Sequence, residues 1–113
     1  MDELSKLKRS VQKKYGDTAI STAMEMEPSI FVPSGSLALD FAIGTGGLPH
    51  NRVIEIAGTE GAGKTTLGIL AMSNFLDRFP DKGAVIIDLE HKLSVEWIQM
   101  LIGEEKARKV IIV

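Results

Sequence analysis

The stretch Gly58-Thr59-Glu60-Gly61-Ala62-Gly63-Lys64-Thr65 matches the pattern G-x-x-x-x-G-K-[ST] at every fixed position. This pattern is typical of a P-loop, in which successive backbone N–H groups face one phosphate group. We expect the ammonium of Lys64 on the β- and γ-phosphates of a nucleotide and the hydroxyl of Thr65 on a Mg²⁺ ion. The alternative is a glycine-rich turn with a solvent-exposed lysine, but a chain of this length matches by chance in well under about 1% of cases.

The three glycines Gly58, Gly61 and Gly63 are expected to give the loop positive φ angles and a close approach to phosphate oxygens. The helix that follows would add the positive end of its dipole at the same place. The predicted nucleotide-binding residues also include the neighbouring positions Thr59, Glu60, Ala62 and Thr66. We therefore expect ATP and Mg²⁺ as the ligands of this loop.

The segments on either side of the loop predict a strand–loop–helix unit. Val53–Ile56 is a short β-branched run, which favours a strand that leads into the loop. A helix is expected from Thr65 to about Phe79, where Pro80 ends it. Its predicted apolar face consists of Leu67, Leu70, Ala71 and Phe75.

The rest of the C-terminal half continues the alternation of strands and helices. Ala84–Ile87 is a nearly continuous apolar run, typical of a strand buried on both faces of a parallel sheet. Ser94–Ile102 predicts a helix and Val110–Val113 a third strand. This order predicts an α/β fold of the P-loop NTPase kind, with a parallel sheet flanked by helices. Because three strands leave edges and faces uncovered, we expect the chain to be the N-terminal part of a longer protein.

Residues 1–33 differ from the rest and are predicted to form a separate assembly arm ahead of an ATPase core at 34–113. A helix is expected from Asp2 to about Lys14, with Gly16 as its stop signal. Its apolar face consists of Leu4, Leu7, Val11 and Tyr15. Such a short helix must dock either on its own core or on a neighbouring subunit, and the sequence favours neither. Asp17–Pro33 contains Pro28 and Pro33, lacks a helical period and predicts an extended stretch.

Between the arm and the loop, the sequence predicts a short helix and a turn. Ser34 or Ser36 can cap a helix over Leu37–Ile43, which Gly44 ends. Gly46–Pro49 is read as a turn that leads into the strand before the loop.

A second candidate site, Asp88-Leu89-Glu90-His91, follows the Ala84–Ile87 strand. In open α/β sheets the ligand lies at the carboxyl ends of the strands, where a carboxylate can orient or deprotonate a water aimed at the γ-phosphate. An acid after a strand is more often a helix cap or a solvated turn residue. His91 has no cysteine and only one other histidine in the chain, so a histidine metal site is not expected.

Composition sets broad limits on the function. The 113 residues carry 13 Lys+Arg against 15 Asp+Glu, a net charge of -2 that neither supports nor forbids a nucleic-acid partner. There are no cysteines, so disulfides are excluded. No apolar run approaches about 18 residues and the N-terminus has no apolar signal region, so we expect a cytoplasmic protein without a membrane partner.

Several motifs in fixed order give the chain its resemblance to a family. They are Pro33-Ser34-Gly35-Ser36-Leu37-Ala38-Leu39-Asp40, Gly46-Gly47-Leu48-Pro49, Val53–Ile56, the P-loop and Ile87-Asp88-Leu89-Glu90-His91. With these motifs the chain resembles the bacterial or phage RecA-type recombinases, essentially throughout from Ser34 onward. The resemblance implies a DNA-dependent ATPase that forms filaments on single-stranded DNA for homologous recombination and DNA repair.

The resemblance also implies roles for single residues. Glu90 would activate the attacking water and, with Lys64, form the catalytic set, while Trp97 would stack on adenine. Ile20 falls in the arm that the family adds to the adjacent protomer, so residues 1–33 would build the filament. Departures from the family occur at Thr59, Ala62, Lys92 and Ser94, the last replacing an aspartate that contacts adenine.

The family's second Mg²⁺-side aspartate and its DNA-binding loops have no counterpart in these 113 residues. We therefore expect this chain alone to be inactive and single-stranded DNA to bind elsewhere. Alternatives are a regulatory paralogue with the RecA fold, a P-loop small-molecule kinase, or a non-catalytic chain that poisons a filament. The kinase fits less well because kinases lack the Leu39-Asp40 helix and the Gly46–Pro49 turn.

Overall fold

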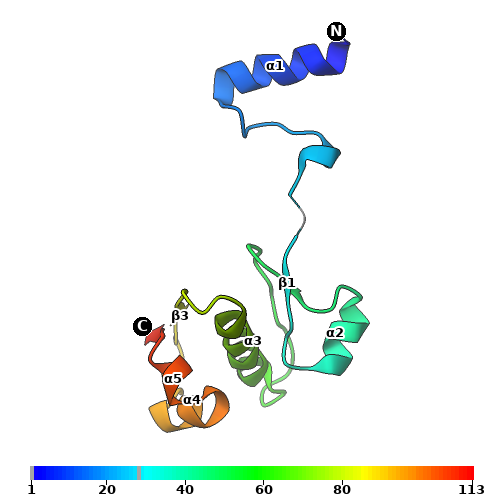
Figure 1. The fold of residues 1–113 in the computed structure, drawn as a ribbon. Helices are drawn as coiled ribbons and strands as arrows, with labels where there is room; N and C mark the ends of the chain where they lie inside the picture. The colour runs from blue at the N-terminus through cyan, green and yellow to red at the C-terminus, as the bar shows by residue number, and fades with distance from the viewer. Residues whose placement is uncertain (1, 28) are drawn as a thin grey trace.

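The computed structural model describes residues 2–27 and 29–113. Met1 and Pro28, both part of the predicted arm, lie outside the described residues. The elements in chain order are α1 (Glu3–Tyr15), a 3-10 turn (Ala23–Glu25), β1 (Phe31–Val32), α2 (Leu37–Ile43), β2 (Leu48–Pro49), α3 (Lys64–Arg78), β3 (Ala84–Ile86), α4 (Val95–Ile102), α5 (Glu104–Ala107) and β4 (Val110–Ile112). Helix α3 lies between two groups of elements, with β1 and α2 on one side and β3, α4 and α5 on the other (Figure 1).

The described strands form two small sheets. Strands β3 and β4 pair in parallel with Ala84 opposite Val110, as expected of strands joined by a helical crossover. Strands β1 and β2 pair antiparallel with Val32 opposite Leu48, so the predicted turn at Gly46–Pro49 ends in a strand instead. The chain is an α/β protein, but the described residues do not form a full P-loop parallel sheet.

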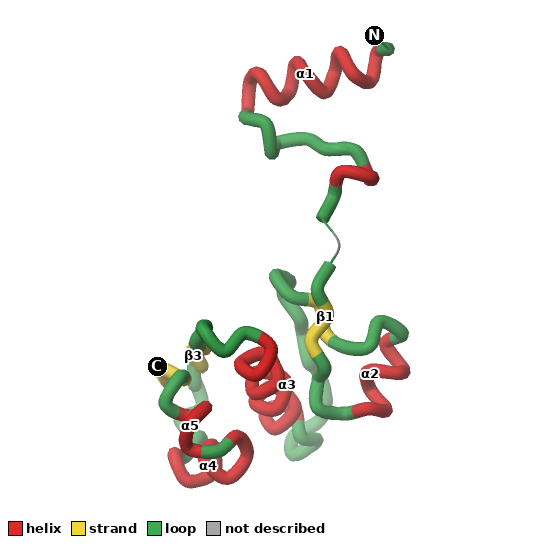
Figure 2. Tube along the Cα trace, in the orientation of Figure 1, coloured by secondary structure: helices red, strands yellow, loops and turns green. Residues whose placement is uncertain are grey.

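The predicted strand at Val53–Ile56 is wrong. Figure 2 shows the chain between β2 and α3 as loop, and Val53 is fully exposed. A strand exists only through hydrogen bonds to a neighbouring strand, and no described segment pairs with these residues. The β-branched run therefore carries strand propensity without the partner that would make it a strand.

The prediction that Ala84–Ile87 is buried on both faces is also wrong. Val85 is 60% exposed and Ile87 70% exposed, whereas Ile86 packs on the core. Alternate residues of a strand face opposite sides, so α3 and α4 cover only one face of the β3–β4 pair. An apolar run thus marks a strand but does not tell how many of its faces this chain covers.

The core forms around α3 and α4. Ile69, Ile98 and Ile102 are buried together, and Ile86 and Val110 from the two parallel strands pack against them. The most buried positions of α3 are Ile69, Ser73 and Leu76, not the predicted face, whose residues are only half-buried. The reason is that α3 has layers on two sides and is apolar around most of its circumference, so its period alone does not select a face.

The β1–α2 connection is held by a buried carboxylate. The backbone N–H of Ser34 donates to Asp40 Oδ1 at 3.0 Å, and both residues are buried. Ser36, one of the two predicted caps, accepts a hydrogen bond from the N–H of Leu39, and α2 ends at Gly44 as predicted. A Cβ at Gly47 would lie 2.3 Å from the carbonyl oxygen of Val32, so this close approach of two backbones requires glycine.

Helix α1 stands apart from the rest of the chain (Figure 1). It begins and ends close to the predicted residues, with Asp2 as its N-cap and Gly16 after its end. Phe31–Val32, placed in the arm by the sequence, belong to the β1–β2 ladder, and Val32 is 6% exposed. Helix α5 was not predicted. No helix in the described residues is long and apolar enough to cross a membrane.

Candidate phosphate-binding site

The glycine loop, residues 58–65, turns the chain into α3. Gly61 and Gly63 have φ angles of 74° and 96°, in the left-handed region that glycine adopts without strain. The N–H of Ala62 donates to the carbonyl of Thr59 at 3.2 Å, which closes the turn. Gly58 does not have a positive φ, so the expectation for that glycine is wrong. A Cβ there would lie 3.6 Å from Ala62, an ordinary contact.

Gly63 is the N-cap of α3, and Lys64 is the first residue of the helix. The first N–H groups of a helix have no partner within it, so they and the helix dipole favour an anion at this end. The glycine loop therefore supplies what a phosphate group requires from a backbone: free donors and a positive local field.

The ammonium of Lys64 is held by the loop itself. Its Nζ donates to the carbonyl oxygens of Gly58 at 2.9 Å and Thr59 at 2.8 Å. Gly58 and Thr59 thus contact the lysine but do not line the pocket beside the loop. The ammonium has three N–H donors, so one donor remains for a phosphate oxygen while the other two stay on these carbonyls. Otherwise, Lys64 must break these hydrogen bonds to contact a phosphate group.

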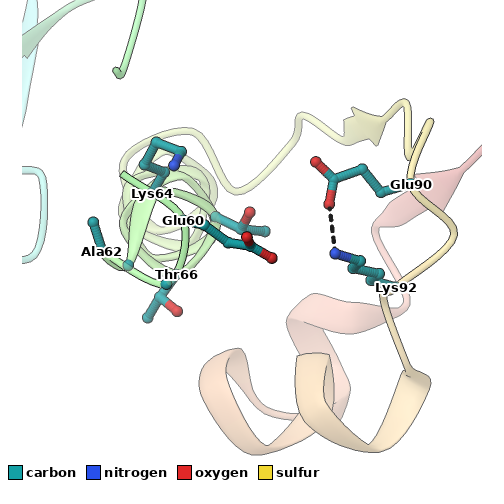
Figure 3. Close-up of a pocket in the computed structure, with 9 residues that line it drawn as sticks. Glu60, Ala62, Lys64, Thr66, Glu90 and Lys92 are labelled. Carbon is teal, nitrogen blue, oxygen red and sulfur yellow. Dashed lines mark ion pairs between the residues drawn. The ribbon is translucent and has the colours of Figure 1, made fainter. Parts of the chain in front are cut away.

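A pocket of about 430 Å³ opens between the loop and the segment after β3. Its lining contains most of the predicted residues, namely Glu60, Gly61, Ala62, Gly63, Lys64, Thr65, Thr66 and Glu90, together with Lys92, which was not predicted. Figure 3 shows Glu90 and Lys92 on the wall opposite the loop. The structure therefore brings Glu90 and Lys64, which are 26 positions apart in the sequence, to the same pocket.

The segment 88–93 has a defined turn. Asp88 donates its N–H to the carbonyl of Val113 at 3.0 Å, beside the parallel ladder, and its Oδ2 accepts from the N–H of Leu93 at 3.1 Å. His91 has a φ of 53°, which bends the backbone between Glu90 and Lys92. Asp88 thus fixes the turn, while the two charged side chains face the pocket.

Lys92 is a pocket residue that the sequence analysis noted only as a departure from the family. Its Nζ lies 3.4 Å from Glu90 Oε2 (Figure 3). A lysine two positions from an acid is a common surface pattern, and no sequence signal marks it as part of a site. The structure shows that both side chains line the same pocket.

Trp97 borders both the core and a second cavity of about 480 Å³. It is half-buried and packs, with Leu101, against the cluster of Ile69, Ile98 and Ile102. The second cavity is adjacent to the first, since Thr65, Glu90 and Lys92 line both. Ser94 caps α4 by accepting from the N–H of Trp97 at 3.2 Å, so its hydroxyl has a structural use.

The oxygen atoms near the loop suit a Mg²⁺ ion that is coordinated mainly by the phosphates of a bound nucleotide. The described residues contain no group of three or more His, Cys, Asp or Glu side chains that could hold a metal by themselves. Magnesium is commonly bound by one or two protein oxygens together with substrate phosphates. Thr65, the second residue of α3, lines the pocket and carries a hydroxyl that fits that role.

Comparison with known proteins places the chain in a family. A family model described as the RecA N-terminal domain matches residues 2–110. The chain is 40% identical to Protein RecA of Mycobacterium ulcerans and 39% identical to Protein RecA of Nocardia farcinica, in each case over 93 residues, which are 80% of the chain. The chain spans about a quarter (26%) of the length of these two relatives. Because the family model covers nearly all of the described fold, the chain belongs to the RecA N-terminal domain family.

Proposed function

We propose that this chain is the ATP-binding part of a RecA-type recombinase. One observation carries the proposal: the loop, Lys64, Thr65 and Glu90 line one pocket at the N-terminus of α3. This geometry offers backbone donors and a lysine for phosphates, a hydroxyl for Mg²⁺ and a carboxylate on the opposite wall. A glycine-rich turn without function has no need to face a carboxylate from another segment.

The chemistry follows from the position of each group. Lys64 would balance charge on the β- and γ-phosphates, and the loop N–H groups would orient them. A bound Mg²⁺, held by Thr65 and the phosphates, would supply further neutralisation of phosphate charge. Glu90 would orient a water and accept its proton, since its exposed carboxylate lies on the pocket wall and can reach a solvent molecule.

The wider activity rests on the resemblance and on family membership. We propose that the whole protein hydrolyses ATP in a DNA-dependent manner, forms filaments on single-stranded DNA and acts in homologous recombination and repair. The arm would dock on an adjacent protomer, because the apolar side chains Leu4, Leu7 and Tyr15 are exposed on α1. DNA would be bound by parts of the protein other than these 113 residues.

Binding of ATP to this chain tests the nucleotide site. Trp97 is the only tryptophan, so Mg–ATP should change its fluorescence if the adenine stacks on the ring. Inorganic tripolyphosphate, which has no base, should bind with a much smaller change, and calorimetry would follow its binding directly. Equal fluorescence responses to both ligands would assign Trp97 to the core alone.

Lys64→Ala should abolish binding of both ligands, because Lys64 is the only side-chain cation of the loop. Lys82→Ala is the matched control, since Lys82 is an exposed lysine outside the pocket. Normal ATP binding by Lys64→Ala would show that the phosphate site lies elsewhere. Glu90→Gln should still bind ATP but lower turnover in the hydrolysing protein by about 10²–10⁴-fold, because it keeps the size of the side chain and loses the base.

A further inference from the structure

Lys92 occupies the junction between the two cavities at the site. Among the residues that the structure describes, three line both cavities: Thr65, Glu90 and Lys92. One cavity extends along the glycine loop, and the other extends toward Trp97. The phosphate groups of a ligand held by the loop would therefore lie in a cavity that Lys92 also lines.

The charges of the loop pocket are balanced without a ligand. Its lining contains the lysines Lys64 and Lys92 and the glutamates Glu60 and Glu90. Lys64 is already shared with the carbonyls of Gly58 and Thr59. A polyphosphate that enters needs cations to offset its charge, and Lys92 is the second ammonium in this lining.

The backbone holds Lys92 in place for such a contact. The hydrogen bond from the N–H of Leu93 to Asp88 Oδ2 closes the turn that contains Lys92, and Lys92 lines the loop pocket. Its own partner, Glu90, is 75% exposed, and exposed ion pairs contribute little to stability. The pair can therefore exchange partners without disturbing the fold.

We propose that Lys92 is a phosphate-binding residue that exchanges its ion pair with Glu90 for the terminal phosphate of a bound triphosphate. The proposal rests on the proposed function and adds a residue to it. The exchange does two things at once: it places a cation on the terminal phosphate, and it frees the Glu90 carboxylate to hold a water. Lys92 thereby couples the presence of a third phosphate to the availability of the base.

This assignment predicts that Lys92 affects the binding of some ligands and not of others. A diphosphate does not reach the position of the terminal phosphate, so it leaves the Glu90–Lys92 pair intact. Lys92 should therefore distinguish triphosphates from diphosphates, whereas Lys64 should matter for both. A solvent-exposed surface pair, the plainer interpretation, would distinguish neither.

The experiment compares Mg–ATP, Mg–ADP and magnesium tripolyphosphate as ligands of the 113-residue chain by calorimetry. Lys92→Gln should weaken both triphosphates by roughly three- to tenfold, as expected for loss of a charge-assisted contact in an exposed site, and leave ADP unchanged. Lys92→Arg should restore triphosphate binding. The matched control is Lys82→Gln, which removes the same charge from an exposed pair with Asp81 and should change nothing.

A double-mutant cycle tests the exchange itself. Glu90→Gln should release Lys92 and tighten triphosphate binding, but this gain should disappear in the Lys92→Gln background. Equal behaviour of Lys92→Gln and Lys82→Gln, or equal weakening of ATP and ADP, would overturn the assignment. If wild type binds triphosphate and Lys64→Ala does not, that outcome leaves the proposed function standing. If wild type binds no triphosphate, the proposed function fails, and the role of Lys92 fails with it.

Discussion

Helices α1 and α4 have the same kinds of capping residues in the sequence, but the structure places them in different environments. Each has a side-chain N-cap, Asp2 or Ser94, and each is followed by a glycine. Within Glu3–Tyr15, all of it described, no side chain is buried, whereas α4 buries Ile98 and Ile102. The difference teaches that an apolar stripe and a cap define a helix but do not supply the surface it packs on.

The arm has polar contacts within itself, which order its backbone locally but leave the side chains of α1 unburied. Lys8 forms an ion pair with Glu25, which joins α1 to the 3-10 turn. The side chain of Gln12 donates to the carbonyl of Asp17 at 3.2 Å, just past the end of the helix. These polar contacts order the arm locally, so the apolar face of α1 remains available to a partner.

Two truncations should give the largest effect and locate where the arm ends. A chain that starts at Ser34 lacks β1 and the buried Val32, so it should lose about 3 kcal/mol or more of stability. A chain that starts at Ser29 keeps β1 and should unfold at the same denaturant concentration as wild type. Urea unfolding followed by circular dichroism measures both, and equal loss in the two chains would place the arm within the core.

The shorter deletion also tests the assembly role of the arm. In the filament-forming protein, removal of residues 1–28 should abolish polymerisation on DNA while leaving nucleotide binding unchanged. Light scattering with single-stranded DNA and ATP measures polymerisation. Filaments that form normally without the arm would show that α1 is not an assembly element.

A pair of alanine substitutions compares the two helices directly. Ile98→Ala should destabilise the chain by about 2–5 kcal/mol, because Ile98 is 3% exposed in the main cluster. Leu7→Ala in α1 should change stability by less than about 0.5 kcal/mol, since Leu7 is 56% exposed. Chemical unfolding of both variants gives the comparison. A large effect of Leu7→Ala would reveal packing of α1 in solution.

The two N-caps should differ in what they stabilise. Ser94→Ala removes the acceptor for the N–H of Trp97 and should lower global stability by about 1 kcal/mol. Asp2→Ala removes the acceptor for the N–H of Ser5, 2.7 Å away, and should reduce helix content without moving the unfolding midpoint. Far-UV circular dichroism separates the two effects. A shifted midpoint for Asp2→Ala would couple the arm to the core.

The smallest expected effect is that of acid: as the pH falls, helix α1 should lose stability before helix α4. The hydrogen bond from the backbone N–H of Ser5 lowers the pKa of Asp2, and the hydrogen bond from Lys8 lowers the pKa of Glu25. A carboxylate with a lowered pKa stabilises the fold above its unfolded pKa, about 4, and loses that contribution as the pH falls through the folded value. Ser94 does not titrate in this range, so NMR should show α1 amides losing protection first.

The sequence was sufficient where the signals are local. The limits of α1, α2 and α4 were predicted to within a residue or two, because capping side chains and glycines act on adjacent backbone groups. The residues of the glycine loop were identified from their spacing alone. The parallel pairing of β3 with β4 was also expected, since the α4 region joins the two strands as a crossover.

The tertiary structure decided what depends on distant partners. Val53–Ile56 has strand propensity but no paired strand, and Phe31–Val32 forms a strand only because Leu48–Pro49 lies beside it. The buried residues of α3 were set by the elements on its two sides, not by its own period. Likewise, the tertiary structure brings Glu90 and Lys92 to the same pocket as the glycine loop, more than 20 positions away in the sequence. Local hydrogen bonds and propensities are encoded within a few residues, whereas burial and strand pairing exist only once separate segments meet.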